Sequence, residues 1–192
     1  MKKHRGEYPM PAIQIPGWMS SPELEWLYQR AKEHRIIIEV GCAYGRSSHA
    51  LLTGNWEGFG HEGRVYCVDP WPKPVKGSKD QFDLGFKDTS RRSVFFQRCG
   101  HFPNLNVIEL PEAEAHYLLI HLLPDMVFLD GGTANIGEEI RLWKKSARSL
   151  LCGHDYSEEY PEVVFQVDAL GPGAKCMEGG TIWYMERKSC CR

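Results

Sequence analysis

Short apolar runs of strand length alternate along the chain with segments whose apolar positions recur at helical spacing. The apolar runs predict strands at residues 36–40, 64–69, 105–110, 126–130, 149–152 and 181–185. The helical spacing predicts a first helix that starts beside Ser20 and ends near residue 34, and further helices at residues 47–52, 89–98, 112–121, 136–148 and 161–170. Between them lie a glycine-rich gap at residues 54–63 and an irregular connection at residues 70–88.

The regular alternation of strands and helices indicates an α/β protein. Because consecutive parallel strands need crossover helices, we expect a Rossmann-like, doubly wound, mostly parallel sheet with helices on both faces. The 192 residues fit a single domain, which we place at residues 20–188. Residues 1–19 are rich in proline and predict an extended arm anchored by Trp18 and Met19, and residues 189–192 form a tail.

The overall charge is nearly balanced, with 23 Lys and Arg residues against 25 Asp and Glu residues. A broad basic surface of the kind that nucleic acid needs is therefore not expected. No apolar run resembles a signal or a membrane span, so we expect a cytoplasmic protein. Cys42, Cys67 and Cys152 lie in apolar segments and are expected to be reduced core residues.

The polar residues of interest follow the predicted strands. In an open parallel sheet, ligands bind beyond the carboxyl ends of the strands. After the first strand comes a turn in which Gly41, Ala43 and Gly45 allow the backbone to bend sharply and approach a ligand before the next helix. Free N–H groups of such a turn would suit an anionic carboxylate, although a purely structural bend is the alternative interpretation.

Two acidic residues narrow the choice of ligand. Asp69, at the end of the second strand, is placed to accept the hydroxyl groups of a ribose. Glu39, before the glycine turn, would face the cationic amino-acid end of the ligand, which is a match that a pyrophosphate does not offer. The pair favours S-adenosylmethionine over a dinucleotide.

Two further residues, Glu112 and Trp71, each have a cofactor-binding interpretation and a structural one. Glu112 could contact the adenine amino group or favour the start of a helix. Trp71 could cover the adenine or pack beneath its loop. The loop aromatics that could line an acceptor site, or pack their own loops, are Trp18, Trp71, Phe82, Phe86 and Tyr156.

Several segments together resemble the class I S-adenosylmethionine-dependent methyltransferases, and among them the group known as methyltransferase family 24. The matching segments are residues 15–19, 39–48, 65–71, 128–131, 153–156 and 180–184. The resemblance implies cofactor contacts at Glu39, Gly41, Ala43, Ser47 and Asp69, with Gly45, Trp71, Glu112 and Asp130 as further candidates. It also implies an acceptor site over Asp130, His154 and Asp155.

The chain departs from the family pattern after the fourth strand. Relatives usually have Asp-Gly-Asp-His there, whereas this chain has Asp130-Gly131-Gly132-Thr133. A second carboxylate and a histidine are therefore missing, and the geometry of the acceptor site is expected to differ.

The resemblance implies transfer of a methyl group to a small molecule, such as the hydroxyl of a sugar or a small ring. His154, with Asp130, is the candidate catalytic pair, and His154 would act as a base or only hold its loop. Asp130 and Asp155 resemble the carboxylates that hold a divalent ion in related enzymes, so Mg²⁺ is a possible second cofactor.

Two alternatives belong to other functional classes. A catalytically silent S-adenosylmethionine-binding or scaffold protein would explain the missing Asp and His. A NAD-dependent oxidoreductase would share the fold, but Arg46, Ser47 and Ser48 follow Gly45 where a third glycine is expected. The identity of the acceptor and the oligomeric state stay open.

Overall fold

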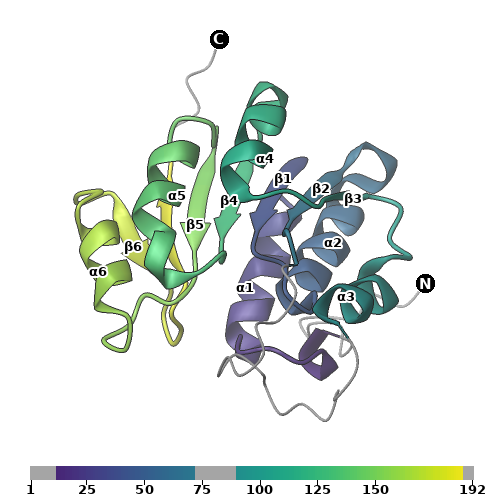
Figure 1. Cartoon of the computed structure of the whole chain (residues 1–192), viewed down its shortest axis with the longest axis horizontal. Coiled ribbons are helices and arrows are strands. Elements are labelled where there is room, and N and C mark those ends of the chain that lie inside the picture. The colour runs from purple at the N-terminus through teal and green to yellow at the C-terminus, as the bar shows by residue number, and fades with distance from the viewer. Residues whose placement is uncertain (1–11, 72–89, 188–192) are drawn as a thin grey trace.

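The computed structural model describes residues 12–71 and 90–187, which form one seven-stranded sheet with helices on both faces (Figure 1). The strands lie in the order β3-β2-β1-β4-β5-β7-β6. They are β1 (Ile36–Val40), β2 (Arg64–Val68), β3 (Leu105–Ile108), β4 (Met126–Leu129), β5 (Leu150–Gly153), β6 (Ala174–Cys176) and β7 (Trp183–Glu186). The helices are α1 (Ser21–Ala31), α2 (Arg46–Phe59), α3 (Arg91–Cys99), α4 (Glu112–Leu119), α5 (Ile136–Trp143) and α6 (Pro161–Asp168).

The first five strands are parallel, and β7 runs antiparallel to both β5 and β6. The sheet order turns outward in both directions from β1 and β4, which lie side by side. This is the topological switch point, where loops diverge at the carboxyl ends of the strands and leave room for a ligand. The Rossmann-like, mostly parallel fold expected from the sequence is confirmed.

Two apolar layers sandwich the sheet. Ile37 packs with α1, α2 and α3 on one face, whereas its neighbour Ile38 packs with α4, α5 and α6 on the other. This follows from the two-residue period of a strand, in which successive side chains point to opposite faces. Because both faces are covered, the central strands are apolar almost throughout.

The predicted glycine gap at residues 54–63 is wrong, because helix α2 continues to Phe59. Gly54 and Gly58 lie within this helix against α1. A Cβ atom on Gly54 would come within 2.2 Å of the Tyr28 carbonyl oxygen, and one on Gly58 within 2.4 Å of the Lys32 carbonyl oxygen. These glycines allow two helices to pack closely and do not form a loop.

Smaller differences concern the ends of the chain and of the helices. Ala12–Gln14 is a short 3₁₀ helix with Ala12 fully buried, so the described part of the arm is not uniformly extended. Met19 is buried as expected, whereas Trp18 is 60% exposed and is not an apolar anchor. The sequence also gave no sign of the edge strand β6, and α5 ends at Trp143, five residues before its expected end.

Several expectations fall on residues outside the described ranges. These are residues 1–11 of the arm, most of the 70–88 connection with Phe82 and Phe86, and the tail at 189–192. Within the described residues, no helix is long and apolar enough to cross a membrane. The described cysteines are all free, and Cys42, Cys67 and Cys152 are buried as expected.

Candidate active site

The predicted site residues gather at the carboxyl ends of β1, β2, β4 and β5. They form two groups, the turn after β1 with Asp69, and an acidic cluster after β4 and β5. The two groups touch at Gly41, which has φ +85° and packs on the backbone of Asp130. A Cβ atom at Gly41 would lie 2.1 Å from the Asp130 carbonyl oxygen, so only glycine allows this approach.

Asp69 organises the turn after β1. One carboxylate oxygen accepts the backbone N–H groups of Cys42 and Ala43 at 3.0 and 2.9 Å, and the other accepts the N–H of Trp71 at 2.7 Å. Burial raises the pKa of Asp69, and these three hydrogen bonds oppose that shift. The expectation that the turn offers free N–H groups to an anionic ligand is therefore wrong for Cys42 and Ala43.

Glu39 and Ser47 form a buried pair behind this turn. The Ser47 hydroxyl donates to one carboxylate oxygen of Glu39, and the Cys67 thiol donates to the other at 3.4 Å. Glu39 is completely buried, and burial raises its pKa despite these donors. Glu39 is the next-to-last residue of β1, so it lies just before the turn.

Trp71 and Ala43 close the other side of the turn. The indole Nε1 donates to the Ala43 carbonyl oxygen at 2.8 Å, and the ring packs on Phe95 with centroids 5.0 Å apart. These contacts match the packing interpretation of Trp71. Gly45 (φ +89°) starts α2 against Phe95 and Cys99, where a Cβ atom would lie 2.8 Å from the Cys99 sulfur.

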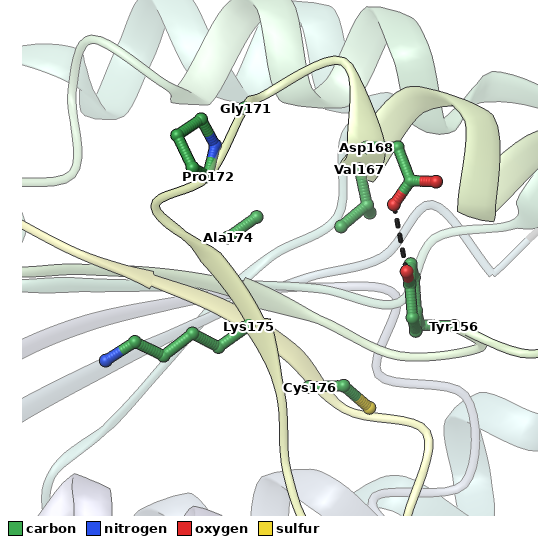
Figure 2. A pocket seen from close by; sticks show the side chains of 8 residues that line it. All are labelled: Tyr156, Val167, Asp168, Gly171, Pro172, Ala174, Lys175 and Cys176. Atoms are coloured by element: carbon green, nitrogen blue, oxygen red, sulfur yellow. Dashed lines mark hydrogen bonds between the residues drawn. The ribbon is translucent and has the colours of Figure 1, made fainter.

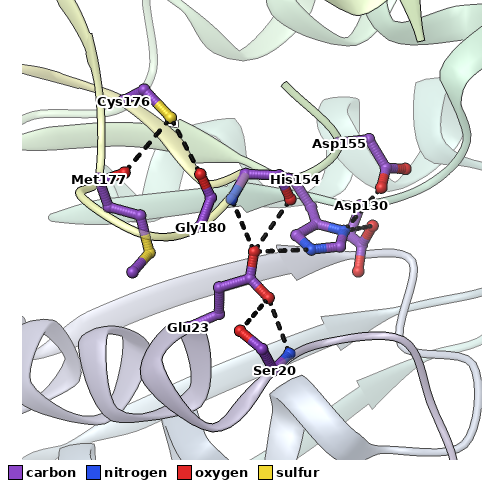
Figure 3. A network of polar contacts seen from close by, with 9 residues as sticks. Ser20, Glu23, Asp130, His154, Asp155, Cys176, Met177 and Gly180 are labelled. Carbon is purple, nitrogen blue, oxygen red and sulfur yellow. Dashed lines mark hydrogen bonds and ion pairs between the residues drawn. The ribbon is translucent and has the colours of Figure 1, made fainter. Parts of the chain in front are cut away.

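The acidic cluster is built around His154 (Figure 3). Its Nδ1 lies 2.9 Å from an Asp155 oxygen and 3.7 Å from an Asp130 oxygen, and its Nε2 lies 3.4 Å from a Glu23 oxygen. Asp155 has φ +66°, a conformation that aspartate tolerates better than most residues and that turns its carboxylate toward His154. One imidazole therefore stands among three carboxylates.

The protonation of this cluster differs from the sequence-based hypothesis. Burial alone would lower the pKa of His154, but hydrogen bonds to Asp155 and Glu23 and the charge of Asp130 raise it to about 10. Burial raises the pKa of Asp130 to about 8, and the charge of His154 limits that rise. At neutral pH His154 is an imidazolium, so in this arrangement it has no free nitrogen with which to act as a base.

Glu23 was not recognised as a site residue from the sequence. The Ser20–Glu23 spacing marks a capping box at the start of α1, which the structure contains. Nothing in that motif indicates that the second carboxylate oxygen reaches Thr181 and His154, because those residues are more than 130 positions away.

Glu112 lies at the start of α4 beside Glu139 of α5. Burial raises the pKa of both carboxyl groups, and for Glu139 it reaches about 9 with Glu112 as the next cause. Such a pair shares a proton at neutral pH. Glu139 also lies beside Gly131, where a Cβ atom would be 2.5 Å from one of its oxygens. Besides Asp130, the carboxyl group of Glu139 therefore lies beside the end of β4, and the sequence analysis did not predict this contact.

The donors after β4 and β5 fit a divalent cation. One oxygen each from Asp130 and Asp155 and one nitrogen of His154 lie within 4.8 Å of one another. Carboxylate oxygens suit Mg²⁺ and Mn²⁺, and imidazole is a common additional ligand for transition metals. The two carboxylates are therefore compatible with the expected metal pair, and His154 would add a third donor only where the incoming ion displaces its Nδ1 proton.

A separate surface pocket of about 300 Å³ lies between α6 and β6 (Figure 2). It is lined by Tyr156, Val167, Asp168, Gly171, Pro172, Ala174, Lys175 and Cys176. The Tyr156 hydroxyl donates to Asp168 at 2.9 Å across its edge. None of the acidic cluster lines this pocket, so Tyr156 faces a different cavity from the one that the sequence suggested.

Comparison with known proteins gives structural matches only. Neither a protein-family model nor a curated protein sequence matches the chain. An O-methyltransferase from Bacillus cereus in complex with SAH superposes with a TM-score of 0.60 at 15% identity, over 92% of this chain and 86% of that one. The SAH-bound methyltransferase PaMTH1 of Podospora anserina gives 0.63 at 12% identity, over 94% and 88%.

The chain has the fold of a class I methyltransferase. The TDP-rhamnose 3′-O-methyltransferase CalS11 of calicheamicin biosynthesis shares it, with a TM-score of 0.59 at 12% identity over 85% of this chain and 76% of that one. The narrower resemblance to methyltransferase family 24 stays a prediction.

Proposed function

We propose that the protein is an S-adenosylmethionine-dependent methyltransferase that methylates a hydroxyl group of a small molecule. The observation that carries this proposal is the contact between Gly41 and the Asp130 backbone, which joins the Asp69-held turn to the acidic cluster. Methyl transfer is an in-line displacement, so the donor and acceptor sites must lie side by side. SAH-bound and sugar-modifying methyltransferases of the same fold support the assignment.

On the donor side, Asp69 would bind the ribose hydroxyls through the oxygen that accepts only the Trp71 N–H, because the other oxygen already accepts two N–H groups. Glu39, two residues before Gly41, would favour a ligand that carries an ammonium and a sulfonium when its carboxyl group is ionised. S-adenosylmethionine, when bound, supplies the methyl group. With Cys42 and Ala43 committed to Asp69, the ligand carboxylate would turn to the first N–H groups of α2 beside Gly45 and Ser47.

On the acceptor side, Asp130 and Asp155 would hold Mg²⁺, and His154 would become a further donor once its Nδ1 proton is displaced. A bound divalent ion would polarise the acceptor hydroxyl. The hydroxyl proton would leave to solvent water, because the two carboxylates that hold the ion, which face Nδ1 of His154, have to stay ionised. Despite burial, hydrogen bonds to Asp155 and Glu23 raise the pKa of His154 to about 10, so we assign it no role as the proton acceptor.

The cofactor assignment is tested by calorimetric titration with S-adenosylhomocysteine, with and without Mg²⁺, and with NADH as the control ligand. Asp69→Asn should weaken S-adenosylhomocysteine binding by about 10- to 100-fold, the equivalent of one hydrogen-bonding carboxylate at ~1.5–3 kcal/mol. Asp125→Asn is the matched control, because Asp125 also accepts two backbone N–H groups, from Arg35 and Ile36, but at the opposite end of β1.

Absence of S-adenosylhomocysteine binding by the wild type would overturn the cofactor class. Binding without methyl transfer to any hydroxyl acceptor, including sugar nucleotides and catechols, would support the silent-scaffold alternative. Equal losses of affinity in Asp69→Asn and Asp125→Asn would show that Asp69 acts on stability alone.

A further inference from the structure

We propose that Glu23 is a positioning residue of the acceptor site, which fixes the ring of His154 so that Nδ1 faces Asp130 and Asp155. This inference rests on the proposed function for its catalytic meaning, although the arrangement of the ring can be tested separately. Glu23 belongs to α1 and reaches the site from outside the strand ends that carry the other residues (Figure 3).

The carboxylate of Glu23 is held by more bonds than helix capping requires. One oxygen accepts the backbone N–H of Ser20 at 2.8 Å, which is the glutamate half of the capping box, and also the Ser20 hydroxyl at 2.7 Å. The other oxygen accepts the N–H and hydroxyl of Thr181, at 2.7 and 2.9 Å, and faces His154. A capping glutamate needs only the first set, so the second indicates a further role.

Burial makes this second set of contacts consequential. Glu23 is 4% exposed and His154 is 9% exposed. Burying a carboxylate without hydrogen-bond partners costs free energy, so the bonds to Ser20 and Thr181 hold Glu23 in one position. From that position its oxygen faces Nε2 of His154 and can accept the Nε2 proton. With Nε2 directed at Glu23, the opposite nitrogen points at the pair Asp130 and Asp155.

The arrangement is typical of a metal-binding histidine whose other ring nitrogen, the one that does not face the ion, donates to a carboxylate. In such sites the outer carboxylate accepts the N–H of the ring and so selects which nitrogen faces the ion. Thr181, before β7, and Ser20, before α1, both depend on the same carboxylate. Glu23 therefore connects the start of α1 and the approach to β7 with the acceptor site.

The ring arrangement is tested by long-range ¹H–¹⁵N spectra of protein labelled at histidine nitrogens, with His154 assigned by the signals missing in His154→Asn. In the wild type we expect a protonated Nε2. Glu23→Gln, which keeps the shape but removes the charge, should shift the Nε2 signal. Ser20→Ala is the matched control, because it removes a donor from the other oxygen of the same carboxylate and should leave His154 signals in place.

A second readout uses Mn²⁺ alone, titrated while the signal of the free ion is followed by electron paramagnetic resonance. Glu23→Gln should bind Mn²⁺ about 10- to 100-fold more weakly than the wild type, as is typical when an outer partner of a ligand is lost. Binding of S-adenosylhomocysteine should stay unchanged, since Glu23 does not contact the Asp69 turn. Unchanged binding of S-adenosylhomocysteine would also show that the Glu23→Gln variant is folded.

An unprotonated Nε2 in the wild type, or identical His154 signals in wild type and Glu23→Gln, would overturn the proposal. If Glu23→Gln fails to fold, Glu23→Asp keeps the charge but is one methylene shorter and should also shift Nε2, and identical signals in wild type and Glu23→Asp would then overturn the proposal. If the wild type does not bind Mn²⁺, the result counts against the proposed metal site and not against the role of Glu23. If the wild type does not bind S-adenosylhomocysteine, the result counts against the proposed cofactor.

Discussion

His154 shows how far the surroundings of a residue decide its chemistry. A histidine after a strand is a candidate base from its ordinary pKa alone. Here Glu23, Asp130 and Asp155 surround the ring, and their charges outweigh the effect of burial. The sequence located the residue correctly, but its protonation depends on Glu23, which comes from a distant helix.

The pH dependence of stability should reveal this cation. The folded-state pKa of His154 is about 10, above the unfolded value of about 6.5, so its contribution to stability is complete below pH 6.5. That contribution is lost as the pH rises toward 10, at up to about 1.4 kcal/mol per pH unit for one proton. Urea unfolding of the wild type between pH 7.0 and 8.5 should therefore show a falling free energy of unfolding.

His154→Gln is expected to show a smaller fall over the same interval, because the variant has no imidazolium to lose. Cysteines of the unfolded chain begin to lose protons in this interval, but both proteins contain the same cysteines, so their titration cancels in the comparison. Parallel curves for the two proteins would mean that His154 is neutral in the folded state.

At the level of elements, the contact between α1 and α2 depends on residues that sequence patterns assign to loops. Glycine ordinarily weakens a helix interior by about 1 kcal/mol relative to alanine. In α2 the absence of a side chain at Gly54 and Gly58 lets the helix approach the backbone of α1. This positions α1, and with it Glu23, against the site.

Gly54→Ala should therefore destabilise the protein although alanine is the better helix former. The added methyl group would meet the Tyr28 carbonyl oxygen and the Ala31 side chain, and such overpacking costs about 1–3 kcal/mol. The measurement is the midpoint of urea unfolding. Gly173→Ala serves as the control, because its nearest contact would be an ordinary 3.9 Å, and a loss equal to that of Gly54→Ala would argue against close helix packing.

For the molecule as a whole, burial divides the cysteines into two classes. Cys42, Cys67, Cys99 and Cys152 are buried in the described structure, and Cys176 is exposed. Cys190 and Cys191 lie outside the described residues. Burial on both faces of the sheet should therefore protect four thiols until the protein unfolds.

This is tested with a thiol reagent on a background in which Cys190 and Cys191 are replaced by serine. We expect one fast-reacting thiol, which disappears in Cys176→Ser, and four that react only as the chain opens. Several fast thiols in the native protein would contradict the packing of the two layers. The thiolate is the reactive form, and partial desolvation of the sulfur with the nearby charge of Glu23 raises the pKa of Cys176 although the residue is exposed, so the reaction is best followed above neutral pH.

The sequence by itself determined the alternation of strands and helices, the glycine turn after β1 and the strand-terminal positions of Asp69, Asp130 and Asp155. These features follow from local rules, because side-chain period and backbone freedom depend on near neighbours. The correct fold class followed from them.

Tertiary structure decided the partners of those residues. Glu23 meets Thr181 across 158 positions, Asp69 takes the N–H groups expected for a ligand, and Glu112 pairs with Glu139. Such contacts are set by how helices pack on the sheet, which no local pattern specifies. Burial and charge at those contacts then fix the protonation of His154 and Asp130, and with it the chemistry available at the site.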